Sequence, residues 1–202
     1  YSNGSVEALK RVTQLAGLEN SSKKLKLVRG DICNMSDLDN AFRFGDGAID
    51  AVVHFAGLKA VGESISTPLK YWNANVSGSL CLLEAMQRNN CHTIVFSSSA
   101  TVYGFPKELP INENALINPI NPYGKTKAAV ENLLFDLATS CSDWRIASLR
   151  YFNPVGAHPS GLIGEDPTGM PNNLFPFVSQ VAVGRRDYLK VFGADWPTPD
   201  GS

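Results

Sequence analysis

A tyrosine and a lysine that stand four residues apart, Tyr123 and Lys127, have the side chains and the spacing for proton transfer. Four residues apart on a helix, two side chains lie on the same face. A free phenol has a pKa of about 10 and is a poor base at neutral pH, whereas a nearby ammonium group favours the phenolate. The pair therefore predicts a proton acceptor for an alcohol, although Tyr-x-x-x-Lys alone is short and is also typical of a solvated helix face.

Two further segments carry polar groups directly after apolar runs. Three serines, residues 97–99, follow the apolar residues 93–96, and their hydroxyl groups can hydrogen-bond a polar substrate. Residues 54–59 close a second apolar run, and small residues there let a ligand approach the backbone while Lys59 reaches an anionic group. Taken alone, each segment is also typical of an ordinary cap or tight turn.

An alternation of strands and helices must position these residues. Short apolar runs alternate with longer stretches whose apolar residues recur every three or four positions, which predicts parallel βαβ units. The expected fold is α/β, a doubly wound parallel sheet, and ligands bind such sheets at the carboxyl ends of the strands. The predicted strands are 25–29, 51–55, 93–96, 146–151 and 188–192, and the predicted helices are 5–18, 36–44, 68–89, 121–140 and 173–184.

This alternation stops in the last quarter of the chain. Glycines and prolines crowd residues 158–171, which excludes a long helix or a central strand there. We therefore predict a first domain over residues 1–155 and the beginning of a smaller, substrate-facing region over residues 156–202.

Composition and charge disfavour several classes of protein. The 202 residues carry 18 Lys+Arg and 19 Asp+Glu, so no basic surface for nucleic acid or for a membrane is expected. No apolar run approaches the roughly 18–20 residues of a membrane span, and residues 1–5 do not resemble a secretory signal. The four cysteines and three histidines are dispersed, which predicts reduced thiols in the cytoplasm and no metal site.

Longer strings of residues resemble a known family. Together with Tyr123 and Lys127 they resemble the UDP-glucose 4-epimerase family of the extended short-chain dehydrogenase/reductases, and the resemblance runs over essentially the whole chain. The three longest strings are HFAGLKAVGES at 54–64, FSSSATVYG at 96–104 and LRYFNPVGAHP at 149–159, and the shorter ones are GEDP at 164–167, PNNL at 171–174 and VGRR at 183–186.

The resemblance implies an NAD-dependent isomerase of galactose metabolism that interconverts UDP-galactose and UDP-glucose through a 4-keto sugar. Tyr123, its pKa lowered by Lys127, would take the proton of the sugar 4-hydroxyl group, and Ser99 would hydrogen-bond the 4-oxygen. The implied NAD contacts are Asn3, Asp31, Ile32, Phe55, Ala56, Gly57, Leu58, Lys59, Asn75, Tyr123, Lys127 and Phe152. The implied contacts to the UDP-sugar are Lys59, Ser99, Ala100, Thr101, Tyr123, Asn153, Asn172, Asn173, Leu174, Val191 and Phe192.

The sequence departs from the family pattern in two ways. Ala74 precedes Asn75 where some members carry a second asparagine, which puts one cofactor contact in doubt. The Gly-x-x-Gly-x-x-Gly turn that binds the pyrophosphate is absent, as is the acidic residue that normally holds the adenine ribose. The resemblance places Tyr1 just after the second strand of the family's sheet, and we expect the arginines for the UDP phosphates to follow Ser202. The 202 residues alone should then bind NAD weakly and turn nothing over.

The resemblance further implies a homodimer, paired through the helices near 68–89 and 123–140. The candidate apolar positions for that contact are Leu82, Met86, Leu134 and Leu137, with the alternative that they face their own sheet.

Other activities stay open or are disfavoured on the chemistry. Related dehydratases need an Asp-Glu pair just past the serine cluster, where this chain has Ala100 and Thr101. A UDP-uronate 4-epimerase is the nearest enzymatic alternative, and it would need a cation for the carboxylate that no added Arg or Lys clearly supplies. A non-catalytic NAD-binding module would not need Ser99, Tyr123 and Lys127 together.

Overall fold

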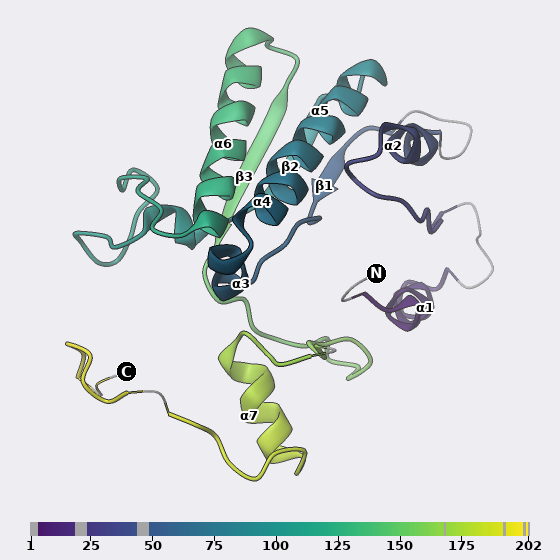
Figure 1. The fold of residues 1–202 in the computed structure, drawn as a ribbon. Coiled ribbons are helices and arrows are strands. Elements are labelled where there is room, and N and C mark those ends of the chain that lie inside the picture. Colours follow the sequence, from purple (N-terminus) through teal and green to yellow (C-terminus); the bar gives the residue numbers. More distant parts are fainter. Residues whose placement is uncertain are drawn as a thin grey trace. The chain divides into compact units, whose positions relative to one another are not determined.

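A computed structural model of the chain describes residues 4–18, 24–43, 49–167, 169–191, 193–199 and 201. The chain divides into two compact units, Ser21–Phe152 on the one hand and Tyr1–Asn20 with Asn153–Ser202 on the other. Figure 1 traces the elements of both units along the chain.

The larger unit is built on a three-stranded sheet in the order β1-β2-β3. Both pairings are parallel, with Val53 opposite Val95 and Val95 opposite Ala147. Parallel neighbours need a long crossover, and helices supply it in this unit. The predicted Rossmann-like α/β fold with a parallel sheet is confirmed. The strands are β1 (Val52–His54), β2 (Thr93–Ser99) and β3 (Arg145–Tyr151).

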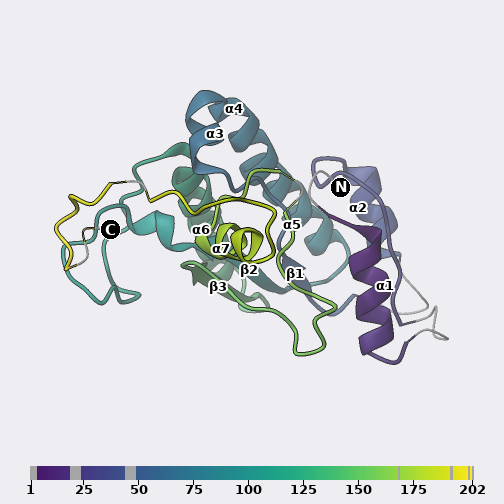
Figure 2. The same cartoon turned by 90° about the horizontal axis from the view of Figure 1, so that it is seen from below.

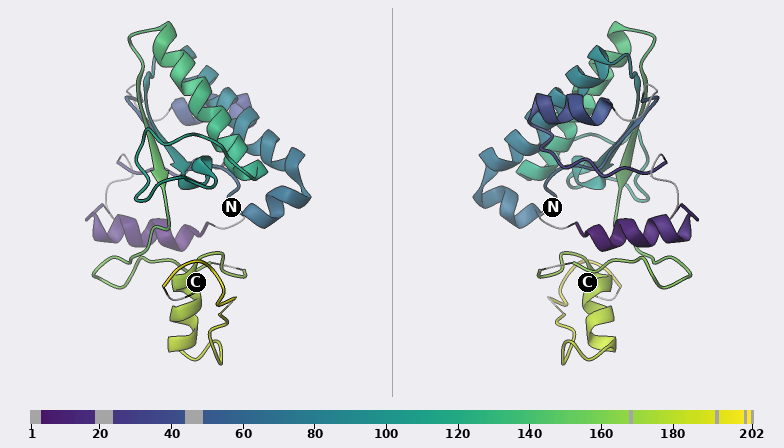
Figure 3. Two further views of the ribbon diagram at one scale, coloured as in Figure 1. Left: turned by 90° about the vertical axis from the view of Figure 1, so that its left-hand side faces the viewer. Right: turned by 90° about the vertical axis from the view of Figure 1, so that its right-hand side faces the viewer.

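Helices of this unit pack over one face of the sheet (Figure 3). The core lies between them, where Ile94 and Phe96 of β2 meet Met86 and Leu134 from two neighbouring helices. On the other face, alternate residues are open, with Val53 58% and Leu149 41% exposed. The helices are α2 (Met35–Phe42), α3 (Val61–Ser66), α4 (Pro68–Tyr71), α5 (Gly78–Arg88) and α6 (Pro122–Ser140), with a π-helical turn η1 (Trp72–Ser77) and a 3-10 turn η2 (Ala100–Tyr103).

The long helix predicted from residue 68 is confirmed, because α4, η1 and α5 follow one another without a gap. Pro68 occupies its first turn, where the missing N–H costs no hydrogen bond. The π-helical turn in its middle, the helix α3 and the turn η2 were not predicted. Figure 2 shows α3 and α4 together, and both pack against α6.

Two predicted strands are wrong. Residues 25–29 and the described part of 188–192 form no strand. A run of β-forming residues becomes a strand only where a neighbouring strand accepts its backbone hydrogen bonds. Among the described residues the sheet ends at β1 on one edge and at β3 on the other, so neither run is a member of it.

The described residues of the smaller unit form the helices α1 (Val6–Leu15) and α7 (Leu174–Ala182), both close to their predicted positions. The side chain of Ser5 caps α1 by accepting a hydrogen bond from the backbone of Glu7. Arg11 of α1 donates to the carbonyl oxygen of Leu162 at 2.9 Å, which joins this helix to the glycine- and proline-rich segment.

Gly104 closes the turn η2 in a conformation that other residues rarely adopt, with φ 63°. A Cβ atom there would lie 2.1 Å from the carbonyl oxygen of Asn118, whose backbone N–H is bonded to Val102. We expect Gly104→Ala to lower the free energy of unfolding by roughly 2–4 kcal/mol, measured by denaturant unfolding. The matched control is Gly62→Ala, since an added Cβ at Gly62 meets nothing within 4 Å. Equal effects of the two substitutions would contradict the strain at Gly104.

Candidate active site

The predicted catalytic residues Ser99, Tyr123 and Lys127 gather where β2 ends and α6 begins. Ser99 is the last residue of β2, and Tyr123 lies in the first turn of α6. Asn121 caps this helix by accepting a hydrogen bond from Gly124 N–H at 2.8 Å. Because this cap fixes the helix start, the side chains of the first two turns have a defined place beside the end of β2.

Tyr123 and Lys127 lie together, as the four-residue spacing requires. The ammonium nitrogen of Lys127 is 5.8 Å from the centre of the Tyr123 ring and 4.9 Å from that of Phe96. It donates a hydrogen bond to the carbonyl oxygen of Ser97 at 2.7 Å. Both side chains are buried. The structure therefore brings a phenol and an amine to one point beside the serine run.

The pKa of Tyr123 is raised, not lowered as expected from its lysine neighbour. Burial raises the pKa of the phenol, and its side-chain hydrogen bond with Ser99 acts in the opposite direction. The physical reason is the placement of Lys127, whose ammonium group is directed to the carbonyl oxygen of Ser97 and lies over aromatic rings. In this structure Ser99, rather than Lys127, is the group that favours the phenolate.

Lys127 is a buried cation, 6% exposed. Burial lowers the pKa of its ammonium group to about 8, because a charge in a low-dielectric interior loses its hydration. The group is therefore still mostly protonated at neutral pH. A poorly hydrated cation of this kind interacts strongly with any polar ligand that reaches it.

The loop after β1, residues 55–59, is largely exposed and passes close to this cation. At Gly57, with φ 148°, an added Cβ atom would lie 3.0 Å from the amide oxygen of Asn75 and 3.9 Å from the ammonium nitrogen of Lys127. Asn75, in the π-helical turn η1, uses its amide to hold the loop. It accepts from Leu58 N–H at 2.8 Å and donates to the Leu58 carbonyl and to Thr126. Asn75 therefore shapes the backbone that is open to a ligand.

The other predicted cofactor and substrate residues of this unit are spread around the same sheet. Thr101 of η2 donates from its hydroxyl group to that of Ser99 at 3.0 Å, and Ala100 stands between them. Asp31 accepts from the backbone of Cys33 just before α2, and Ile32 packs against the core at α5. Phe152 follows β3 and is exposed. Asn3 lies outside the described residues.

The remaining predicted substrate residues belong to the smaller unit, and the structure describes them only within it. Asn172, Asn173 and Leu174 are consecutive at the start of α7, where Asn173 is the cap residue. Asn153 and Val191 are exposed. Phe192 lies outside the described residues.

Comparison with known proteins identifies the family. Residues 4–198 match the NAD dependent epimerase/dehydratase family. The chain belongs to this family.

Named relatives align with this epimerase/dehydratase chain from end to end. It is 54% identical over 202 residues to UDP-glucose 4-epimerase 2 of Arabidopsis thaliana and 52% identical over 201 residues to UDP-glucose 4-epimerase of Bacillus subtilis, and it spans 57% of each. The crystal structure of UDP-glucose 4-epimerase from Bifidobacterium longum in complex with NAD⁺ and UDP superposes with a TM-score of 0.91 at 48% identity, over 100% of this chain and 58% of that one. The chain thus spans somewhat more than half the length of these relatives.

Within this family member, the four apolar residues expected at a contact between copies are placed in its own core. Leu82, Met86 and Leu134 are buried there, and Leu137 packs against them. The structure supports the alternative for these positions, that they face their own sheet, and side chains that do so are not available to a second copy. Exposed apolar residues on the same helices are Leu80 and Phe135, 44% and 72% exposed.

His54, at the end of β1, is a buried residue that the sequence reasoning did not single out for a structural role. Its Nε2 atom lies 2.9 Å from the hydroxyl group of Ser79, which in turn donates to the Asn75 carbonyl oxygen. Burial, assisted by the charge of Lys127, lowers the pKa of His54 to about 4. A polar residue inside the apolar run 51–55 was the signal available in the sequence.

The lowered pKa of His54 makes the stability of the fold depend on pH. The unfolded chain binds a proton at this residue below pH 6.5, whereas the folded chain binds it only near pH 4, so stability is lost as the pH falls through this range. Between pH 7 and pH 5, His54 should cost the parent about 2 kcal/mol of its free energy of unfolding. The variant His54→Gln should lack this decrease, as measured by denaturant unfolding at both pH values. The exposed His158, replaced by Gln, is the control. An unchanged pH dependence in His54→Gln would contradict the burial of a neutral imidazole.

Among the ranges that the structure describes, no helix is both long and apolar enough to cross a lipid bilayer.

Proposed function

We propose that the whole protein is an NAD-dependent UDP-glucose 4-epimerase, an isomerase that interconverts UDP-galactose and UDP-glucose. The observation that carries the proposal is the convergence of Ser99, Tyr123 and Lys127 at the carboxyl end of β2. The phenolate of Tyr123, stabilised by the hydrogen bond with Ser99 and next to a buried ammonium group, suits the removal of a proton from an alcohol. The relatives named UDP-glucose 4-epimerase support the choice of substrate.

The residues around this point fit a dinucleotide cofactor. The loop 55–59 exposes its backbone, Gly57 leaves room for close approach, and Lys127 supplies a buried positive charge. NAD, when bound, supplies a hydride acceptor for C4 of the sugar and later returns the hydride to the other face of that carbon. Lys127 and residues 55–59 would hold NAD, and Asp31, Ile32 and Phe152 would contact other parts of this cofactor.

Side chains of this protein would then transfer the proton of the sugar 4-hydroxyl group and bind its oxygen. As the phenolate, Tyr123 takes the proton of the 4-hydroxyl group while the C4–H bond breaks, and the resulting phenol gives this proton back when the carbonyl is reduced. Ser99 donates a hydrogen bond to the 4-oxygen and holds it at the phenol. Lys127 stabilises the negative charge on the phenolate once a ligand draws the ammonium group from the Ser97 carbonyl. Because the hydride returns to the carbon that it left, the reaction involves no net oxidation or reduction of the sugar or of NAD.

The smaller unit would contact the UDP-sugar through Asn153, Asn172, Asn173, Leu174, Val191 and Phe192. We further infer a homodimer in which exposed apolar residues of α5 and α6, Leu80 and Phe135, meet those of a second copy. A cytoplasmic location agrees with the four dispersed cysteines of the sequence.

The test is conversion of UDP-galactose that carries deuterium at C4, followed by NMR on the whole protein with NAD. We expect UDP-glucose with the deuterium still at C4, because the hydride returns to the carbon that it left. Release of the deuterium to water would refute this mechanism. Faster conversion of UDP-galacturonate would favour the uronate epimerase, and binding of NAD and UDP without turnover would favour a non-catalytic module.

A further inference from the structure

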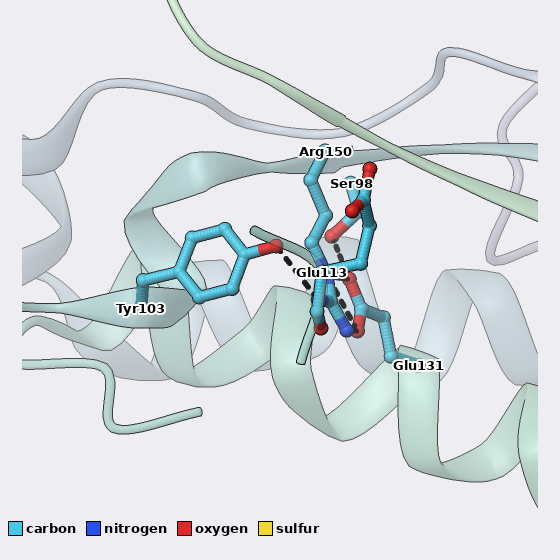
Figure 4. A network of polar contacts seen from close by, with 5 residues as sticks. All are labelled: Ser98, Tyr103, Glu113, Glu131 and Arg150. Atoms are coloured by element: carbon cyan, nitrogen blue, oxygen red, sulfur yellow. Dashed lines mark hydrogen bonds and ion pairs between the residues drawn. The ribbon is translucent and has the colours of Figure 1, made fainter. Parts of the chain in front are cut away.

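A partly buried network of polar side chains lies one helical turn beyond Lys127 (Figure 4). Its centre is an ion pair in which Arg150 grips both carboxylate oxygens of Glu131, with Nε at 3.0 and 3.2 Å and a terminal nitrogen at 2.7 Å. The hydroxyl group of Ser98 donates to the same carboxylate. The second terminal nitrogen of Arg150 donates to the Tyr103 hydroxyl at 2.8 Å and to the Glu113 carbonyl at 3.1 Å.

Each member of the network adjoins an element of the candidate site. Ser98 precedes Ser99 at the end of β2, and Tyr103 ends the turn η2 that begins right after Ser99. Glu131 lies four residues after Lys127 on α6, so Tyr123, Lys127 and Glu131 form one stripe along that helix. Arg150, on β3, bonds directly to α6 through Glu131 and to η2 through Tyr103, and the Glu131 carboxylate in turn accepts from Ser98 of β2.

The ion pair between Arg150 and Glu131 has the geometry of a rigid connection between β3 and α6. The two charged side chains are only 23% and 11% exposed, and a planar guanidinium group with two parallel bonds to a carboxylate fixes both orientation and distance. Such a pair contributes little net stability, because desolvation offsets the attraction, but it defines the relative position of the parts that carry it.

We propose that Arg150 and Glu131, with Ser98 and Tyr103, are positioning residues that hold the end of β2 and the turn η2 against α6, and so set the place of Ser99 relative to Tyr123. The proposal rests on the proposed epimerase function for its kinetic consequence. It has a second consequence, because Glu131 is on the same face of α6 as Lys127. With its carboxylate taken by Arg150, Glu131 does not compete for the ammonium group of Lys127, which then has the Ser97 carbonyl to leave before it serves the phenol and a ligand.

The decisive variant is the double substitution Glu131→Met with Arg150→Met in the whole protein. Removing both charges avoids leaving one buried and unpaired, so the fold should keep its thermal stability to within a few degrees. We expect kcat for UDP-galactose to fall about tenfold to a hundredfold while KM and UDP affinity stay within about twofold, because misplacement of reacting groups lowers the rate and not the binding. The milder variants Ser98→Ala and Tyr103→Phe should show the same pattern with smaller changes.

The matched control is Arg88→Met with Asp39→Met, an ion pair at 2.9 Å that also joins two elements, α5 and α2. It should leave kcat unchanged. A double variant of Glu131 and Arg150 that folds and retains the parent's kcat overturns the proposal. So does a loss of UDP affinity equal to the loss of kcat. If that double variant does not fold, the same criteria, kcat and UDP affinity, apply to Ser98→Ala and Tyr103→Phe.

A spectroscopic readout tests the network without reference to turnover. The groups around the Tyr123 phenol are Ser99 from β2, Tyr71 from α4 and Lys127 from its own helix. Since the hydrogen bond with Ser99 lowers the pKa of Tyr123, its loss should raise that pKa. The pKa is read from phenolate absorbance as the difference between each protein and its Tyr123→Phe counterpart. An unmoved phenol pKa counts against the network even if the whole protein has another activity, whereas a raised pKa without epimerisation counts against the proposed function alone.

Discussion

Tyr123→Phe is expected to lower kcat for UDP-galactose by about 10²- to 10⁴-fold and to leave the Kd for UDP within about twofold. The phenol is buried and hydrogen-bonded to Ser99, and phenylalanine fills the same space without the group that takes the proton. The measurement is steady-state epimerisation by the whole protein together with calorimetric binding of UDP.

Tyr188→Phe is the control, because it removes an exposed phenol outside the proposed machinery. The assignment of the proton acceptor fails if Tyr123→Phe keeps more than about a tenth of the parent's kcat, since general acid–base catalysis is worth more than that. A matching fall in UDP affinity would show that the phenol acts in binding rather than in the reaction.

Lys127→Met is expected to lower kcat by about 10²- to 10³-fold and at the same time to stabilise the fold. Burying the ammonium group lowers its pKa from 10.5 to about 8, which corresponds to a cost of about 3 kcal/mol at neutral pH. Methionine removes that cost and gives up one hydrogen bond to the Ser97 carbonyl, worth about 1 kcal/mol. The net gain at pH 7 should be about 2 kcal/mol, measured by denaturant unfolding.

The sign of the pH dependence provides the control for Lys127. Because the folded pKa is lowered, the unfolded chain binds the extra proton between pH 8 and 10.5, so the parent gains stability as the pH rises through this range. The difference between parent and Lys127→Met should therefore shrink from pH 8 upward. A variant that is less stable than the parent at pH 7 would mean that the charge is compensated in the folded chain.

Much of the fold followed from local sequence. The spacing of apolar residues placed α2, α6 and α7 to within a few residues, and Asn121-Pro122 marked the start of α6 because a capping side chain followed by proline is a helix-start signal. The predictions that failed were the run 25–29 and the described residues 188–191 of the last run, whose composition suits a strand but whose state depends on a partner strand.

In the candidate site, too, local sequence predicted some features and missed others. Spacing alone put Tyr123 and Lys127 on one helix face, and the strings around residues 54–64 and 96–104 pointed to the family. The sequence did not reveal that Lys127 bonds to the Ser97 carbonyl, that the pKa of Tyr123 is raised, or that Asn75 holds the loop after β1.

By itself, then, the sequence determined which residues bear chemistry and which local elements carry them, because capping, helical spacing and strand composition act over a few neighbouring positions. Only the tertiary structure decided how charges are paired and buried, since Glu131 and Arg150 are 19 positions apart and Asn75 and Thr126 are 51 apart. Desolvation and hydrogen bonding depend on what surrounds a group in space, and this surrounding is set by how the helices pack on the sheet.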